Sequence, residues 1–87
     1  MQSHWSIDLI FEEDGVRTRC SAALSGAQAP QVSGHGFSRR NPSDQPDIRI
    51  GEEVAAARAL SNLSHELLEQ AAHTIESHTH HPVHLAS

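Results

Sequence analysis

The longest regular pattern of apolar and polar residues runs from residue 54 to residue 75. Its apolar positions recur at spacings of three and four: Val54, Ala57, Leu60, Leu63, Leu67, Ala71 and Ile75. This is the period of one face of an α-helix, and alanine and leucine both favour helix. Glu52 and Glu53 suit the positive end of a helix dipole, and Pro82 lies beyond the far end. The pattern predicts a helix over about residues 51–78.

A second pattern, alternation with a period of two, precedes the helix. Its apolar positions are Trp5, Ile7, Leu9 and Phe11. This alternation predicts a half-buried strand over about residues 4–13. Asp14 and Gly15 then form a typical two-residue hairpin turn, because a type I′ turn needs positive φ at both positions. We therefore predict a second strand over about residues 16–25.

This turn also predicts the register of the hairpin. It places Leu9 opposite Cys20 and Phe11 opposite Thr18, so that the apolar side chains share one face. A slip of one residue would move every side chain to the other face.

A third, weaker strand is predicted over about residues 32–39. Gly34 and Gly36 lower its strand propensity, and they indicate either a bulge or a close approach of another backbone. Strict alternation would place Phe37 on the face opposite to Val32, whereas a bulge at the glycines would bring both inward.

The remaining segments complete the predicted topology. Residues 41–47 hold two prolines and form a turn-rich connection, from which Ile48 and Ile50 lead into the helix. The predicted fold is α+β, with the order β–β–β–α. A three-stranded antiparallel meander packs on one long C-terminal helix, in a single domain of residues 1–87 with an irregular, histidine-rich tail at residues 79–87.

Few large apolar side chains are available to form a core. The hydrophobic fraction is 37%, with one Trp, two Phe and no Tyr. Burying a large apolar side chain stabilises a fold by about 1.5–3 kcal/mol, whereas ordering costs about 1.5 kcal/mol per residue. A monomer would be marginal, and the edges of a small sheet also need cover. We therefore expect a homodimer.

The charge is negative overall but unevenly distributed. The net charge is −5, lysine is absent, and five of the six arginines lie between residues 17 and 49. The total argues against non-specific nucleic-acid binding, which needs summed positive charge. The arginine-rich middle segment is a local exception.

Cysteine usage and hydropathy indicate the compartment. Cys20 has no partner for a disulfide within the chain, which suits a reducing cytosol. The first residues carry no basic, apolar signal sequence, and no segment approaches the ~18–20 apolar residues of a membrane span. We expect a soluble, cytoplasmic protein without membrane contact.

The candidate nucleic-acid-binding residues lie on the second and third strands and just after them. They are Arg17, Arg19, His35, Arg39 and Arg40. Arginine suits phosphate recognition because its planar guanidinium donates a fork of hydrogen bonds. The alternative is that Asp8, Glu12 and Asp44 neutralise these cations as ordinary cross-strand pairs.

Other chemistry-bearing residues favour no further site. The histidines at the end of the chain are His73, His78, His80, His81 and His84. Such tracts can bind metal, but without a scaffold we expect a solvated polar tail. Ser61, Ser64 and His65 lack the third group and the oxyanion site of a triad, and Cys20 falls in the inward phase of its strand. We expect no catalytic residue, metal, cofactor or small-molecule substrate, and no enzyme activity.

These features resemble a small actinobacterial family of uncharacterised proteins, some of whose mycobacterial members are associated with hypoxia and dormancy. The matching parts are the hairpin, Gly34-x-Gly36, the loop at residues 40–46, the helix start at residues 50–63, and residues 79–83. The resemblance implies an intertwined homodimer. It also implies a fold similar to double-stranded-RNA-binding domains and to ribosome hibernation promoting factors. Those factors use basic surfaces, from which this acidic, lysine-free chain departs.

Two functional hypotheses follow. The first is a non-enzymatic stress or dormancy protein that contacts the ribosome or other RNA through the arginine patch, as the resemblance implies. The second is a homodimeric protein–protein interaction module without nucleic-acid contact.

Overall fold

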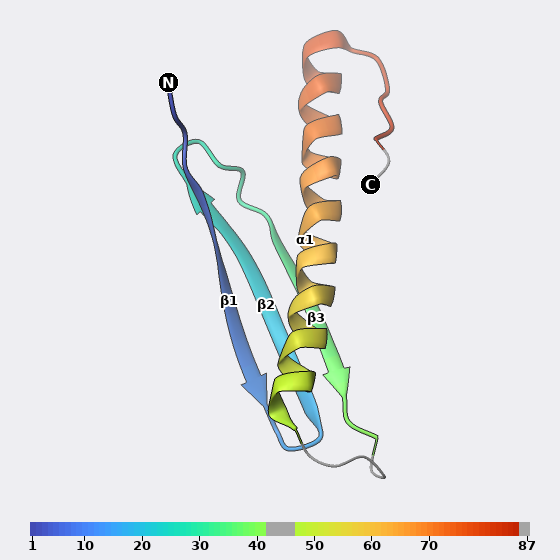
Figure 1. Cartoon of the computed structure of the whole chain (residues 1–87). Coiled ribbons are helices and arrows are strands. Elements are labelled where there is room, and N and C mark those ends of the chain that lie inside the picture. The colour runs from blue at the N-terminus through green and yellow to red at the C-terminus, as the bar shows by residue number, and fades with distance from the viewer. Residues whose placement is uncertain (42–46, 86–87) are drawn as a thin grey trace.

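The computed structural model describes residues 1–41 and 47–85. Three strands, β1 (Trp5–Glu13), β2 (Arg17–Gly26) and β3 (Ser33–Arg39), precede one helix, α1 (Ile48–Thr79). The strands form an antiparallel sheet in the order β1-β2-β3, and α1 lies across one face of it (Figure 1). The predicted α+β fold with the order β–β–β–α is confirmed. Most of the predicted connection at residues 41–47 falls on residues 42–46, which lie outside the described residues.

The β1–β2 hairpin has the predicted faces but a different turn. Phe11 pairs with Cys20 rather than with Thr18, a shift of two positions. The central residues of the turn are Gly15 and Val16, because the Asp14 N–H donates to the Arg17 carbonyl at 3.1 Å. A shift by two leaves every side chain on its predicted face.

The Asp14 side chain explains why the turn is centred on Gly15 and Val16 rather than on Asp14 and Gly15. Its Oδ1 accepts from the backbone N–H of Arg17 at 2.7 Å and of Val16 at 3.1 Å. These two hydrogen bonds hold the pKa of the Asp14 carboxyl below its usual range. Aspartate is therefore the first residue of the turn, where its side chain satisfies two backbone donors, and of the two central residues only Gly15 takes positive φ, at 92°.

We expect Gly15→Val to destabilise the protein by about 1–2 kcal/mol, because the left-handed region costs an L-residue about that much. Nothing lies within 4 Å of a Cβ built at Gly15, so crowding does not contribute. Gly15→Asn is the matched control, since asparagine tolerates positive φ. Thermal melting of both variants tests the turn, and equal melting temperatures for Gly15→Val and the wild type would contradict it.

Helix α1 begins three residues earlier than predicted, at Ile48. Asp47 is the N-cap, and its Oδ1 accepts from the Arg49 N–H at 3.0 Å. The hydrogen bond from the Arg49 side chain, then that from its backbone, lowers the pKa of Asp47. Ile48 and Ile50 are thus in the first helical turn, although their alternation resembles the end of a strand. The helix ends at Thr79, where His80 takes a left-handed conformation and donates to the Glu76 carbonyl at 2.7 Å.

The face of α1 that packs on the sheet differs from the predicted stripe. The buried positions are Ala55, Ala59 and Leu63, at a spacing of four. Of the predicted stripe only Leu63 is fully buried, while Ala57 and Leu60 are exposed. Two of the three buried positions are therefore alanines outside the predicted stripe, and the reason lies in β3.

Two glycines of β3 let the helix backbone approach the sheet directly. A Cβ at Gly36 would lie 2.7 Å from the Ala55 carbonyl oxygen and closer still to Ala59 N, and a Cβ at Gly34 would overlap the helix in the same way. The prediction of a close backbone approach is confirmed. The β2–β3 register is continuous from Arg17–Arg39 to Ala23–Ser33, without a bulge.

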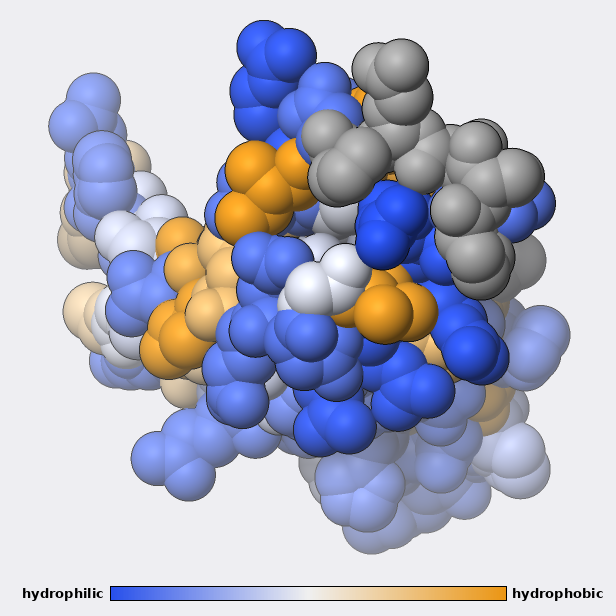
Figure 2. All heavy atoms as spheres, turned by 90° about the horizontal axis from the view of Figure 1, so that it is seen from below, coloured by the Kyte–Doolittle hydropathy of each residue, from blue (hydrophilic) through white to orange (hydrophobic). Residues whose placement is uncertain are grey.

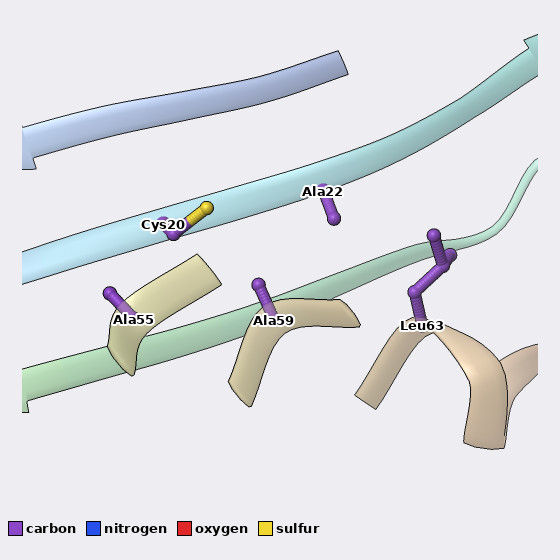
Figure 3. Close-up of a cluster of buried hydrophobic side chains, with 5 residues drawn as sticks. All are labelled: Cys20, Ala22, Ala55, Ala59 and Leu63. Atoms are coloured by element: carbon purple, nitrogen blue, oxygen red, sulfur yellow. The ribbon is translucent and has the colours of Figure 1, made fainter. Parts of the chain in front are cut away.

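The core between sheet and helix is small. Figure 3 shows its five side chains: Cys20 and Ala22 from β2, and Ala55, Ala59 and Leu63 from α1, pointing toward one another. Cys20 is 1% exposed, as its inward phase predicted. Burial raises the pKa of its thiol, which agrees with the expectation of an inert core cysteine.

Much apolar surface remains uncovered, because α1 packs on β2 and β3 and leaves β1 open (Figure 1). Trp5 and Ile7 are 47% and 45% exposed, although both lie on the helix side of the sheet. At the end of the molecule that holds the β1–β2 turn, hydrophobic patches reach the surface between hydrophilic residues (Figure 2). Val16, Ile48 and Ile50 contribute exposed area there.

The described part of the tail turns back along α1 (Figure 1). The Val83 N–H donates to Glu76 Oε2 at 3.0 Å, and Val83 and Leu85 are half-buried. Residues 80–85 form neither helix nor strand, and these contacts attach them to α1.

Candidate nucleic-acid interface

The face of the sheet away from α1, here called the outer face, gathers basic, polar and aromatic side chains from β2 and β3. The register places Arg17 beside Arg39, Arg19 beside Phe37, and Ser21 beside His35. These positions share one face because side chains alternate along a strand.

Four of the five predicted site residues come together on the outer face: Arg17, Arg19, His35 and Arg39. Arg40 lies beyond the end of β3, where its backbone N–H donates to the Val16 carbonyl at 2.8 Å and its side chain is half-buried. The candidate interface is therefore centred on the two strands rather than on the loop after them.

The acidic residues of β1 border this group without forming ion pairs with it. Glu12 is the cross-strand neighbour of Arg19, and Asp8 is that of Ala23. Within the described part of the chain, Arg17, Arg19 and Arg39 form no ion pair. The outer face is thus acidic along β1 and basic along β2 and β3, and the guanidinium groups keep hydrogen-bond donors for a ligand.

Phe37 is the residue of this face that the sequence analysis did not assign to the site. It is 55% exposed, and the Arg17 guanidinium carbon lies 5.4 Å from its ring centroid, in a cation–π arrangement. The signal was present in the sequence, because strict alternation in β3 groups Phe37 with His35 and Arg39. The glycines on either side of His35 left a bulge open as the alternative.

The helix holds β3 in place from behind. The Arg58 guanidinium donates to the Phe37 carbonyl at 2.8 Å, and Asn62 Nδ2 donates to the His35 carbonyl. The Ser38 hydroxyl donates to the Gly51 carbonyl at 2.8 Å. The first two bonds satisfy carbonyls of the edge strand β3, and the third ties β3 to the first turns of α1, so the outer face is presented on a fixed scaffold.

The other chemistry-bearing residues do not assemble into a site in the described part of the chain. No three His, Cys, Asp or Glu side chains there converge well enough to hold a metal ion. The Ser64 hydroxyl donates to the Ser61 carbonyl at 2.8 Å rather than to His65. The helix that the structure describes also lacks the apolar length needed to cross a membrane.

Fold and surface together define the class: a small β–β–β–α protein with one long helix and a partly basic open sheet face. The chain belongs to the Rv2632c-like family, whose model matches residues 3–84. It is 46% identical over 77 residues to the uncharacterized protein Rv2632c of Mycobacterium tuberculosis H37Rv, covering 88% of this chain and 82% of that protein. It is 39% identical over 82 residues to the uncharacterized protein Mb1767 of Mycobacterium bovis, covering 94% and 86% of the two chains.

A solved structure has the same fold. The crystal structure of Rv2632c matches with a TM-score of 0.82 and 40% sequence identity, over 94% of this chain and 96% of that chain. The arrangement of three strands and one long helix is therefore shared with a crystallographically determined relative.

Proposed function

We propose that this protein is a non-enzymatic, cytoplasmic RNA-binding protein that acts as a homodimer on the ribosome during stress or dormancy. The observation that carries the proposal is the cluster of Arg17, Arg19 and Arg39 on the outer face, without ion pairs to the described residues. Guanidinium groups donate to phosphate oxygens in a planar fork. The stress and ribosome assignments rest on the resemblance described above.

The test is the salt dependence of binding to purified ribosomes and to isolated ribosomal RNA. Each phosphate neutralised by a cation releases counterions, so affinity must fall steeply as salt rises. We expect Arg19→Gln with Arg39→Gln to lower affinity on the order of tenfold or more and to flatten the log–log salt slope by roughly 1.4–1.8, since each lost contact removes about 0.7–0.9. Both side chains are exposed, so the fold should be retained.

A charge-matched control separates local contacts from total charge. Ser61→Glu with Ser64→Glu changes the net charge from −5 to −7, as the arginine pair does, but on exposed positions of α1. We expect this control to keep the wild-type salt slope. Failure of the wild type to bind at low salt, or equal binding by the arginine variant, would overturn the RNA proposal.

A second function, a homodimeric protein–protein interaction module without nucleic-acid contact, is favoured by a different observation. Trp5, Ile7 and Leu9 of β1 face the helix side and are exposed, and the net charge of −5 opposes RNA at long range. Co-sedimentation with ribosomes from stressed and from growing cells distinguishes the two, because only the first function predicts that the protein travels with ribosomes.

A further inference from the structure

The outer face carries an aromatic ring where a purely electrostatic site would need none. Phe37 is 55% exposed in the middle of β3, directly opposite Arg19 and two residues before Arg39. A single exposed apolar residue needs no explanation by itself, but this one lies beside the guanidinium groups of Arg17 and Arg19, which form no ion pair within the described part of the chain.

We propose that Phe37 is a stacking platform for an unpaired base, and that the outer face therefore takes single-stranded rather than duplex RNA. This inference rests on the proposed RNA-binding function and specifies its ligand. Bases in a duplex hide their flat faces in the stack, whereas bases of a single strand can stack on an aromatic ring or a guanidinium plane. The ring would add nothing to the binding of a duplex backbone.

The geometry around the ring matches such a ligand. The Arg17 guanidinium lies over the Phe37 ring, 5.4 Å from its centroid. A base can displace this guanidinium from the ring or stack on the guanidinium plane. Arg19 lies across from Phe37 on β2 and Arg39 lies two residues further along β3, so both are at strand spacing and can meet the flanking phosphates. His35 and Ser21 share a hydrogen bond at 3.2 Å, which offers a polar pair to a base edge or a 2′-hydroxyl.

The helix holds the Phe37 platform rigidly. The Arg58 side chain holds the Phe37 carbonyl, and Gly36 packs against the helix backbone, so β3 cannot shift when a ligand binds.

The basic part of the outer face is limited in extent. Successive outward side chains are about 6.6 Å apart along a strand and about 4.8 Å apart between strands. With Asp8 and Glu12 along β1 repelling phosphate, the basic part of the face spans two strands and accommodates about two or three nucleotides.

The experiment compares a ten-nucleotide RNA without internal pairing with a ten-base-pair duplex that contains the same sequence, by fluorescence anisotropy at several salt concentrations. We expect the wild type to bind the single strand more tightly. Phe37→Ala should weaken single-strand binding by about 5- to 150-fold, the loss typical of one stacked base, and leave the salt slope unchanged because no charge is removed. Phe37→Trp should restore binding, with quenching of the new indole beyond that of Trp5 in the wild type.

The matched control is Ile10→Ala, because Ile10 is a 62% exposed apolar residue on the same face but on β1. We expect its affinity to equal that of the wild type. Tighter binding of the duplex, or an unchanged affinity of Phe37→Ala while Arg19→Gln with Arg39→Gln still loses binding, would overturn the stacking inference and leave RNA binding intact. Failure of the wild type to bind either RNA would overturn both.

Discussion

Replacing Gly36 with alanine is expected to cost at least about 3 kcal/mol of folding free energy, the upper part of the range for overpacking. A chain of 87 residues has a total stability of about 4–13 kcal/mol, so Gly36→Ala should be unfolded or close to it at 37 °C. The added methyl group would meet the Ala55 carbonyl oxygen and the Arg58 carbonyl carbon at 2.7 Å. Both are helix backbone atoms, which cannot move aside as the end of a flexible side chain can.

The measurement is chemical denaturation followed by circular dichroism. Gly15→Ala is the matched control: it adds the same methyl group, but into open space, so only its positive φ contributes. Adding Ala59→Gly to Gly36→Ala should not restore stability, because the overlap is with backbone. Recovery in that double variant, or a Gly36→Ala protein as stable as the Gly15→Ala control, would contradict the direct packing of the helix on β3.

Replacing Ile75 with aspartate is expected to convert a homodimer into a monomer and to lower its melting temperature. Ile75 is 39% exposed and lines an open groove with Trp5, Leu67 and Ala71. When a second copy covers this apolar surface, the new aspartate would be buried in the interface without a partner of opposite charge. Burying an unpaired charge is strongly unfavourable. Leu67→Asp should have a larger effect, because Leu67 is half-buried already within one protomer.

The area of the chain supports a second copy as the partner. Folded monomers of 9.5 kDa expose about 5,000 Å², whereas this chain exposes 6820 Å². The excess, roughly 1,800 Å², exceeds the ~800 Å² that each partner buries in an interface of standard size. The radius of gyration is 16.3 Å, against about 12 Å for a compact chain of this length. An elongated chain with such a small core gains the most stability when a second copy of the same chain covers its apolar side.

Light scattering coupled to size exclusion measures the mass, which we expect to be about twice 9.5 kDa at micromolar concentration. Ile10→Asp is the control, since it places the same charge on an exposed apolar residue of the outer face and should leave the mass unchanged. A wild-type protein with the mass of one chain and a melting temperature independent of protein concentration would contradict the homodimer proposal.

Dimerisation and RNA binding can be tested separately, because the two surfaces lie on opposite faces of the sheet. The apolar groove lies on the helix side of the sheet, and the candidate RNA interface lies on the outer face. Ile75→Asp therefore probes assembly without touching Arg19 or Phe37. In a dimer the outer faces of two copies would be present, so loss of the dimer should weaken RNA binding only through lost multivalency.

The order of elements and the face of each residue in the first two strands could be predicted from the sequence, because both follow from local periodicity. Alternation placed Cys20 inward and Arg17 and Arg19 outward, and a shift of two residues in the hairpin changed none of this. The turn itself could not be predicted, because the choice between Asp14–Gly15 and Gly15–Val16 depends on where the Asp14 carboxylate finds its donors.

Only the tertiary structure decided which helix face is buried and what the outer face contains. Periodicity favoured the largest apolar residues of α1, but Gly34 and Gly36 allow backbone contact with the helix, which buries Ala55 and Ala59 beside Leu63. Alternation and a bulge were both compatible with the same glycines, so the position of Phe37 depended on the pairing of β3 with β2. Both outcomes depend on contacts between segments distant in the chain, and local patterns carry no information about such distances.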